Sequence, residues 1–327
     1  MVWDRENDVG EQLDLFGNRT GPVVVAKPAM SEAEPEPVAS APIVLPGQMD
    51  LFGERWLRAG AAHKALESFD LEGASEALTE AVRLYPADNE LRERATLVGK
   101  LAGALRDARD RHKSAAEALS AIAGEVPAFL MGMWHRHVAE LMEREGGSGS
   151  VLHGIPAGFH WLHAGDAALA EQSLRATLAT LDDDREACCR ARAYLGDALI
   201  VLGRRNEALL EYREAIANCP TAVDWPKILD VSVRDLPAIA ELDYEVPSNP
   251  ADWAAAIGLI DGVFIPPSIM PEDWLEASVL DGLSAGQRFY RWMVAESAAR
   301  ENSDRIACRR SMKALSSRLL LEILARR

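Results

Sequence analysis

The sequence is poor in aromatic residues and has no long apolar run. Aromatic residues make up 6% of its 327 positions, and its hydrophobic share of 48% comes mainly from alanine and leucine, which is typical of a helical protein. No apolar run approaches the roughly 18 residues of a membrane span. The N-terminus, MVWDRENDVG, lacks a basic start followed by an apolar core. We therefore expect a soluble, cytoplasmic protein without membrane contact.

Cysteine is also scarce. Cys188, Cys189, Cys219 and Cys308 form no C-x-x-C pair, so reduced thiols are expected rather than a disulfide framework or a metal site. The sequence contains no G-x-x-x-x-G-K-[ST] and no H-E-x-x-H motif. A phosphate-binding loop and the common zinc-protease mechanism therefore have no motif behind them.

The histidines offer little further support for catalysis. His135 and His137 are two residues apart, which places them on different faces of a helix. His160 and His163 share a face, but no carboxylate lies one turn from both. We expect structural roles for these side chains, and hence no enzyme, no metal and no cofactor; a metal-dependent enzyme that uses them is the alternative.

Charge is unevenly distributed. The formal net charge is −16, of which residues 1–55 carry −6, residues 56–299 carry −15 and residues 300–327 carry +5. Such an acidic body repels the phosphates of nucleic acids and is better suited to protein partners. Only the basic C-terminal helix could contact nucleic acid or another anion.

The clearest pattern lies in residues 189–222, CRARAYLGDALIVLGRRNEALLEYREAIANCPTA. Apolar spacing predicts helices over 191–202 and 206–218, with Gly203 ending the first and Pro220 closing the second. Small residues on one helix then face large residues on the other, which allows close packing.

This segment resembles a tetratricopeptide repeat. The family pattern is carried by Gly196, Ala208, Tyr212, Ala215 and Pro220. It departs from the family at Arg192 and Leu199, where large apolar or aromatic residues are usual. The resemblance implies an all-α fold built as a superhelix of antiparallel helix pairs, an α-solenoid.

Two other segments repeat the spacing. Helices over 56–69 and 73–85 carry Ala74, Leu78, Ala81 and Pro86 at the mutual spacing of Ala208, Tyr212, Ala215 and Pro220. Helices over 155–164 and 167–181 carry Gly158, Gly165, Ala170 and Leu174, each 38 residues before its counterpart, although Asp182 replaces the closing proline. Further helical runs cover 89–108 and 113–145, and the sequence GGSGS at 146–150 predicts a flexible break.

We therefore divide the chain into a disordered tail (1–53), an N-terminal helical repeat region (54–145), tetratricopeptide-like repeats (151–222) and a helical C-terminal cap (223–327). The cap ends in predicted helices over 285–301 and 303–325. Met312, Leu315, Leu319, Leu320 and Ile323 form one apolar stripe, and Arg305, Arg309, Arg310, Lys313 and Arg318 lie largely off it. This pattern indicates an array cap with a solvated basic face, or a helix for an acidic partner such as the tail.

Tetratricopeptide arrays bind peptides or helices of partner proteins in a groove lined by the first helix of each pair. By the resemblance, the groove residues are Phe159, Leu162, His163, Arg190, Asp197 and Ile200. Leu162 and Ile200 could instead belong to the core between repeats.

The tail contains a repeated five-residue word: Gln12-Leu13-Asp14-Leu15-Phe16 recurs as Gln48-Met49-Asp50-Leu51-Phe52. Both copies resemble the short peptide by which many proteins dock on the bacterial sliding clamp, the second departing from it at Met49. The resemblance implies that the glutamine binds at the pocket rim while the leucine-phenylalanine pair fills an apolar cleft. In the second copy, Asp50 could instead cap the first folded helix, with Leu51 and Phe52 packing beneath it.

These patterns predict a non-enzymatic adaptor. Its groove would hold one protein while its tail docks on another, plausibly the sliding clamp. The alternative is an autoinhibited regulatory protein whose tail binds its own groove.

Overall fold

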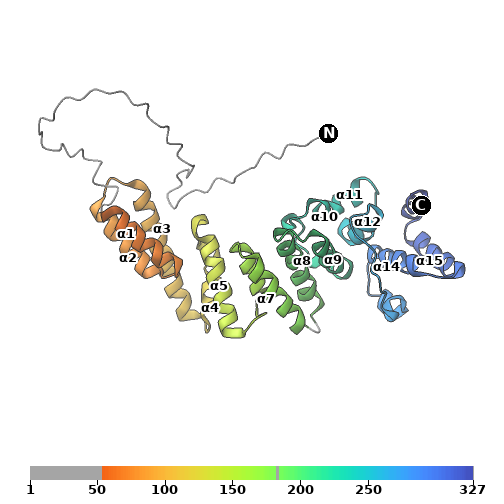
Figure 1. Cartoon of the computed structure of the whole chain (residues 1–327), viewed down its shortest axis with the longest axis horizontal. Coiled ribbons are helices and arrows are strands. Elements are labelled where there is room, and N and C mark those ends of the chain that lie inside the picture. Colours follow the sequence, from red (N-terminus) through yellow and green to blue (C-terminus); the bar gives the residue numbers. More distant parts are fainter. Residues whose placement is uncertain (1–53, 182–183, 327) are drawn as a thin grey trace, which may run out of the picture.

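The computed structural model describes residues 54–181 and 184–326, and this part of the chain is mostly helical (Figure 1). Its first helices are α1 (Glu54–Glu67), α2 (Leu71–Leu84), α3 (Asn89–Arg111), α4 (Ala115–Ala121), α5 (Met131–Gly146), α6 (Ala157–His163), α7 (Ala167–Thr180), α8 (Arg185–Val201) and α9 (Arg205–Asn218). The later helices are α10 (Val231–Arg234), α11 (Leu236–Leu242), α12 (Ala254–Ile260), α13 (Ala277–Leu280), α14 (Ala285–Ala298), α15 (Asn302–Leu315) and α16 (Ser317–Ala325). Between α5 and α6, the short strands β1 (Val151–Leu152) and β2 (Ile155–Pro156) form an antiparallel hairpin. None of the described helices is both long and apolar enough to cross a bilayer.

From α1 to α9, each helix packs against the next helix in sequence. Figure 1 shows the helices following one another along the long axis of the molecule, from α1 to α3 at one end to α14 and α15 at the other. Aspartate and serine side chains begin five of these helices by accepting a backbone N–H of the first turn, as expected of N-caps. These caps are Asp70, Asp88, Ser114, Asp166 and Asp184.

The three helix pairs predicted from the sequence share one turn. Phe69, Gly165 and Gly203 occupy the equivalent position, with positive φ angles of 53°, 87° and 75°. Each donates its N–H to the carbonyl three residues earlier, and the next residue donates to the carbonyl five residues earlier. Glycine adopts this left-handed conformation without steric cost, whereas Phe69 adopts it at some cost.

Two of the three pairs, α6 with α7 and α8 with α9, share a close helix contact at a glycine. Gly196 lies so close to Tyr212 that an added Cβ would be 2.5 Å from the ring, and at Gly158 it would be 2.4 Å from Leu174. The alanine one turn before each large residue is fully buried in all three pairs, at positions 74, 170 and 208. The buried alanine is thus common to all three pairs, and the glycine contact to two of them.

Two predicted long helices are each broken. The run over 113–145 divides into α4 and α5, joined by two short 3₁₀ turns, because Pro127 disfavours a helical conformation at Val126. The run over 303–325 divides at Ser316, which leaves the helical conformation and caps α16 by accepting the N–H of Leu319.

The glycine-rich segment 146–150 was predicted to be a flexible break, but it packs against α7. Thr177 donates its hydroxyl to the carbonyl of Gly149 at 3.1 Å. A Cβ at Gly149 would lie 2.6 Å from the backbone nitrogen of Thr177. Glycine is needed here for close approach of two backbones as well as for the turn.

The buried apolar side chains form two clusters. The first spans α1 to α5 and ends at Ala157, and the second extends from Ala139 on α5 to Ile323 on α16. Regions 151–222 and 223–327 therefore share one core. Gln287 of α14 strengthens their junction by donating to the carbonyls of Ala217 and Asn218 at the end of α9.

In the C-terminal cap, the predicted apolar stripe faces the core. Met312, Leu319, Leu320 and Ile323 are buried, and Leu315 is half-buried. Part of the predicted basic face is neutralised: Arg309 pairs with buried Glu296 at 2.8 Å, and Arg318 pairs with Glu245. Arg310 and Lys313 are exposed.

Candidate partner-binding surface

The predicted groove residues lie on two neighbouring first helices of the repeated pairs. Phe159, Leu162 and His163 are on α6, and Arg190, Asp197 and Ile200 are on α8. The structure separates them into surface and core positions.

Four rings form a continuous strip across α5, α6 and α8. This aromatic strip consists of His135, Phe159, His163 and Tyr194. The ring centroid of Phe159 lies 4.3 Å from that of His163 and 4.8 Å from that of Tyr194, and the centroids of His163 and His135 are 5.0 Å apart. His163 is exposed and the other three rings are half-buried. The strip is therefore a surface feature held in place by ring–ring packing.

His135, at one end of the strip, pairs with His160, which is buried beneath it. Nδ1 of His135 and Nδ1 of His160 are 3.0 Å apart, so one ring donates a proton and the other accepts it. Burial, with a smaller contribution from His163, lowers the pKa of His135 to about 4. Burial, with smaller contributions from His135 and His163, lowers the pKa of His160 to about 3. Both rings are consequently neutral at neutral pH.

Trp134 fixes the position of this histidine pair. Its ring packs edge-on against His135 and His160, at centroid distances of 4.7 and 5.5 Å. Its Nε1–H donates to the carbonyl of Leu119 at 3.0 Å, which anchors α5 to α4. The strip thus rests on side chains with defined hydrogen-bond partners.

Two basic side chains lie beside the strip and are held by hydrogen bonds. Arg190 donates from Nη1 to the carbonyl of Gly154 in the β1–β2 turn at 3.0 Å and from Nη2 to Glu186 at 2.6 Å. Lys227 pairs with Asp224 at 2.7 Å and remains exposed.

The rings of the strip are uncharged. Burial raises the pKa of Tyr194, and partial burial together with the charge of Lys227 lowers the pKa of His163. At neutral pH the strip is therefore an uncharged aromatic surface with cations at its edge.

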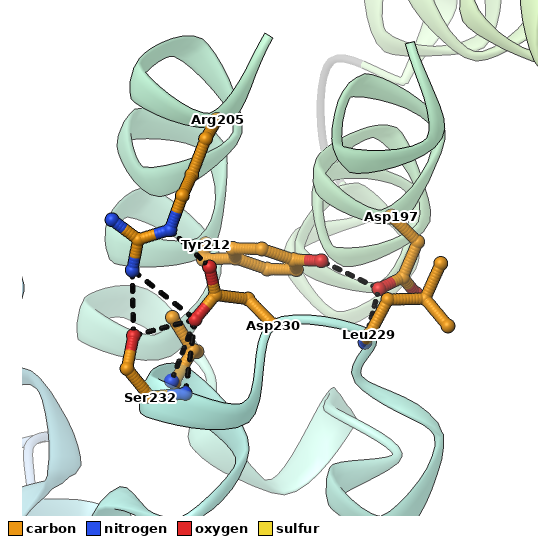
Figure 2. Close-up of polar contacts among 7 residues, drawn as sticks. Asp197, Arg205, Tyr212, Leu229, Asp230 and Ser232 are labelled. Atoms are coloured by element: carbon orange, nitrogen blue, oxygen red, sulfur yellow. Dashed lines mark hydrogen bonds and ion pairs between the residues drawn. The ribbon is translucent and has the colours of Figure 1, made fainter. Parts of the chain in front are cut away.

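Asp197, predicted to line the groove, lies in the core instead, with 5% of its surface exposed. Its Oδ1 accepts the Tyr212 hydroxyl at 2.5 Å and the backbone N–H of Leu229 at 2.9 Å (Figure 2). Burial raises its pKa to about 6, although both hydrogen bonds act in the opposite direction. Asp197 therefore ties α8 and α9 to the following loop and is not available to contact a partner.

Leu162 and Ile200 are half-buried and pack against the second core cluster. Their environment matches the alternative of a core between repeats. Of the six predicted groove residues, Phe159, His163 and Arg190 thus remain as surface candidates. The tail residues Gln12 to Phe16 and Gln48 to Phe52 lie outside the described part of the chain.

Sequence reasoning missed His135 and Tyr194. Tyr194 could have been found, because it lies one helical turn after Arg190 on α8. His135 could not, because its approach to α6 depends on how two helices pack. In the described ranges, no group of three or more histidine, cysteine, aspartate or glutamate side chains is arranged to hold a metal ion.

Comparison with known proteins gave no match: no protein-family model, no curated protein and no solved structure is similar to this chain.

Proposed function

We propose that this protein is a non-enzymatic adaptor. Its helix pairs act as a tetratricopeptide-like array that binds a protein partner on the aromatic strip, while its tail docks on the bacterial sliding clamp. The observation that carries the first half is the strip itself. Side chains from three helices, α5, α6 and α8, join into one aromatic surface.

The chemistry of the strip favours peptide binding. Aromatic rings supply large contact areas with little loss of side-chain entropy, and they are enriched at the centres of protein interfaces. Phe159, His163 and Tyr194 all come from α6 and α8, the first helices of their pairs. In tetratricopeptide arrays, this is the helix that faces the groove, which supports the comparison with that family.

The strip can be tested by affinity capture from a bacterial lysate with the intact protein and with Phe159→Ala/His163→Ala. Leu169→Ala serves as a matched control, because Leu169 is an exposed apolar residue on α7, a helix that contributes no ring to the strip. We expect at least one captured protein to bind the intact and control chains and to be lost with the strip variant. Identical captures by all three chains would exclude the strip as the binding surface.

The second half of the proposal rests on the first tail word, which meets the clamp-peptide pattern at all five positions. Leu15 and Phe16 would be the anchors in the clamp pocket, so each truncation should cost about 2 kcal/mol, or roughly thirtyfold in affinity. The measurement is a titration of purified bacterial sliding clamp against the intact protein, Leu15→Ala/Phe16→Ala and Leu51→Ala/Phe52→Ala. The absence of binding at tens of micromolar clamp would refute this half alone.

A further inference from the structure

A small cleft lies between the start of α9 and the segment that follows α12. Its volume is about 350 Å³. Its lining combines apolar side chains (Leu209, Leu210, Val263 and Ile265) with polar ones (Arg205, Asn206, Ser232 and Asp261). The carboxylate of Asp261 is already paired with Arg326 at 2.6 Å. This volume is at the small end of ligand sites. The cleft therefore has room for a few side chains of an extended peptide, and a helix would not fit.

The apolar wall is exposed although its backbone is fixed. Ile265 is 73% exposed and Leu210 is 46% exposed. The carbonyl of Ile265 accepts a hydrogen bond from Nη1 of buried Arg213 at 2.5 Å, and the preceding residue, Phe264, is buried. Covering these exposed apolar side chains with a ligand is favourable, because it removes apolar surface from water.

The polar wall offers donors to an acidic group. Arg205 donates from Nε to Asp230 at 2.6 Å and from Nη2 to the Ser232 hydroxyl at 2.8 Å (Figure 2). The two N–H groups of its Nη1 take part in neither contact, and just over half of its side chain is exposed. Hydrogen bonds from arginine to carboxylate are among the stronger ones in proteins.

We propose that this cleft receives the first tail word, residues 12–16 of the same chain. Leu15 and Phe16 cover Leu210 and Ile265, and Asp14 binds Arg205. The word supplies an acidic residue and two large apolar side chains within three positions, which is the combination that the two walls require.

The chain is long enough for this contact. The 37 residues between Phe16 and Glu54 can extend to at most about 130 Å. Nine helices in a single row, with axes about 10 Å apart, would measure only about 80 Å. The six prolines between the first word and α1 favour an extended spacer. The second word is excluded as the occupant, because only Gly53 separates Phe52 from α1.

This inference rests on the proposal that the first word is a docking peptide, but it does not depend on the clamp. If both hold, the cleft and the clamp compete for the same five residues. The free protein then shields Leu15 and Phe16 from water, and clamp binding releases the cleft.

The experiment is site-specific photo-cross-linking in the full chain without clamp. Phe16 is replaced by p-benzoylphenylalanine, and the products are mapped by mass spectrometry. We expect a product of monomer mass joined to residues 205–210 or 261–265. The matched control carries the same group at position 52 and should give no such product. Leu210→Asp and Ile265→Asp should each reduce the cross-link at least tenfold, and circular dichroism checks that both variants remain folded.

Cross-links to the aromatic strip, a product of dimer mass or the absence of any cross-link would overturn the proposal. Retention of the cross-link in both folded cleft variants would also overturn it. Clamp is added in a separate arm. A cross-link that persists with excess clamp supports the cleft contact and counts against clamp docking, whereas loss of the cross-link supports both.

Discussion

The contact between Gly196 and Tyr212 gives the sharpest test of the repeated helix pairs. In Gly196→Ala, the new Cβ would lie 2.5, 2.7 and 2.8 Å from Cε1, Cδ1 and Cζ of the Tyr212 ring. Ordinary contacts begin near 3.4 Å. The ring is fully buried and its hydroxyl is bound to Asp197. It therefore cannot move away without breaking a buried hydrogen bond.

The size of the effect follows from three contributions. Overpacking costs about 1 to 3 kcal/mol, and loss of a hydrogen bond to a buried carboxylate costs about 1.5 to 3 kcal/mol. Replacing glycine by alanine within a helix stabilises the helix by about 0.5 to 1 kcal/mol, which offsets part of this loss. Together they lead us to expect that Gly196→Ala lowers the free energy of unfolding by about 1.5 to 5.5 kcal/mol.

Gly103→Ala is the matched control, because Gly103 lies inside α3 and nothing stands within 4 Å of its added Cβ. Only the helix contribution remains there, so this variant should gain about 0.5 to 1 kcal/mol. Urea unfolding followed by circular dichroism measures both. If Gly196→Ala is as stable as the parent, the close approach of α8 and α9 is wrong.

Three further predictions concern the same core and the histidine pair. Ala208→Leu should overpack the α8–α9 contact and cost about 1 to 3 kcal/mol, measured by thermal unfolding; an unchanged transition would contradict this packing. Below pH 6.5 His160 is protonated in the unfolded chain, whereas in the folded chain it stays neutral down to its pKa of about 3. The free energy of unfolding should therefore decrease as the pH is lowered, by up to about 1.4 kcal/mol per pH unit for this residue. His160→Gln should have a correspondingly shallower dependence between pH 6.5 and 4, and equal slopes would count against the buried pair with His135. Tyr212→Phe should raise the pKa of Asp197 further, because it removes a hydrogen-bond donor to the charged carboxylate. The measurement is a pH titration of the Asp197 carboxyl chemical shift by NMR. An unchanged pKa would show that the hydrogen bond from Tyr212 is absent.

Much of the helix-pair pattern could be predicted from the sequence. Small residues at fixed spacing, glycines at the turns and aspartates before the helices are local signals, and each acts within a few residues of the feature that it specifies. Pro127 and Ser316 are local signals too, but they lie in apolar runs whose periodicity continues past them. Periodicity alone therefore predicted helices that were too long.

The candidate surface was less predictable. Phe159 and His163 follow from helical spacing, since they are one turn apart. Their contacts with His135 and Tyr194 depend on the approach of α5, α6 and α8. Asp197 was predicted to line the groove but is buried, because its position on the helix indicates only the direction of its side chain and not what covers it. The loop that carries Leu229 covers this carboxylate, and nothing near Asp197 in the sequence indicates that loop.

The division of the core into two clusters has a consequence for how the protein unfolds. Clusters that meet only across α5 and α6 can open as separate cooperative units, so a single free energy of unfolding need not describe the chain. Gly103 lies on a helix of the first cluster and Gly196 on a helix of the second. In native-state hydrogen exchange, Gly103→Ala should therefore slow the opening of α1 to α4, and Gly196→Ala should speed the opening of α8 and α9. Each substitution would leave the other half of the molecule unchanged.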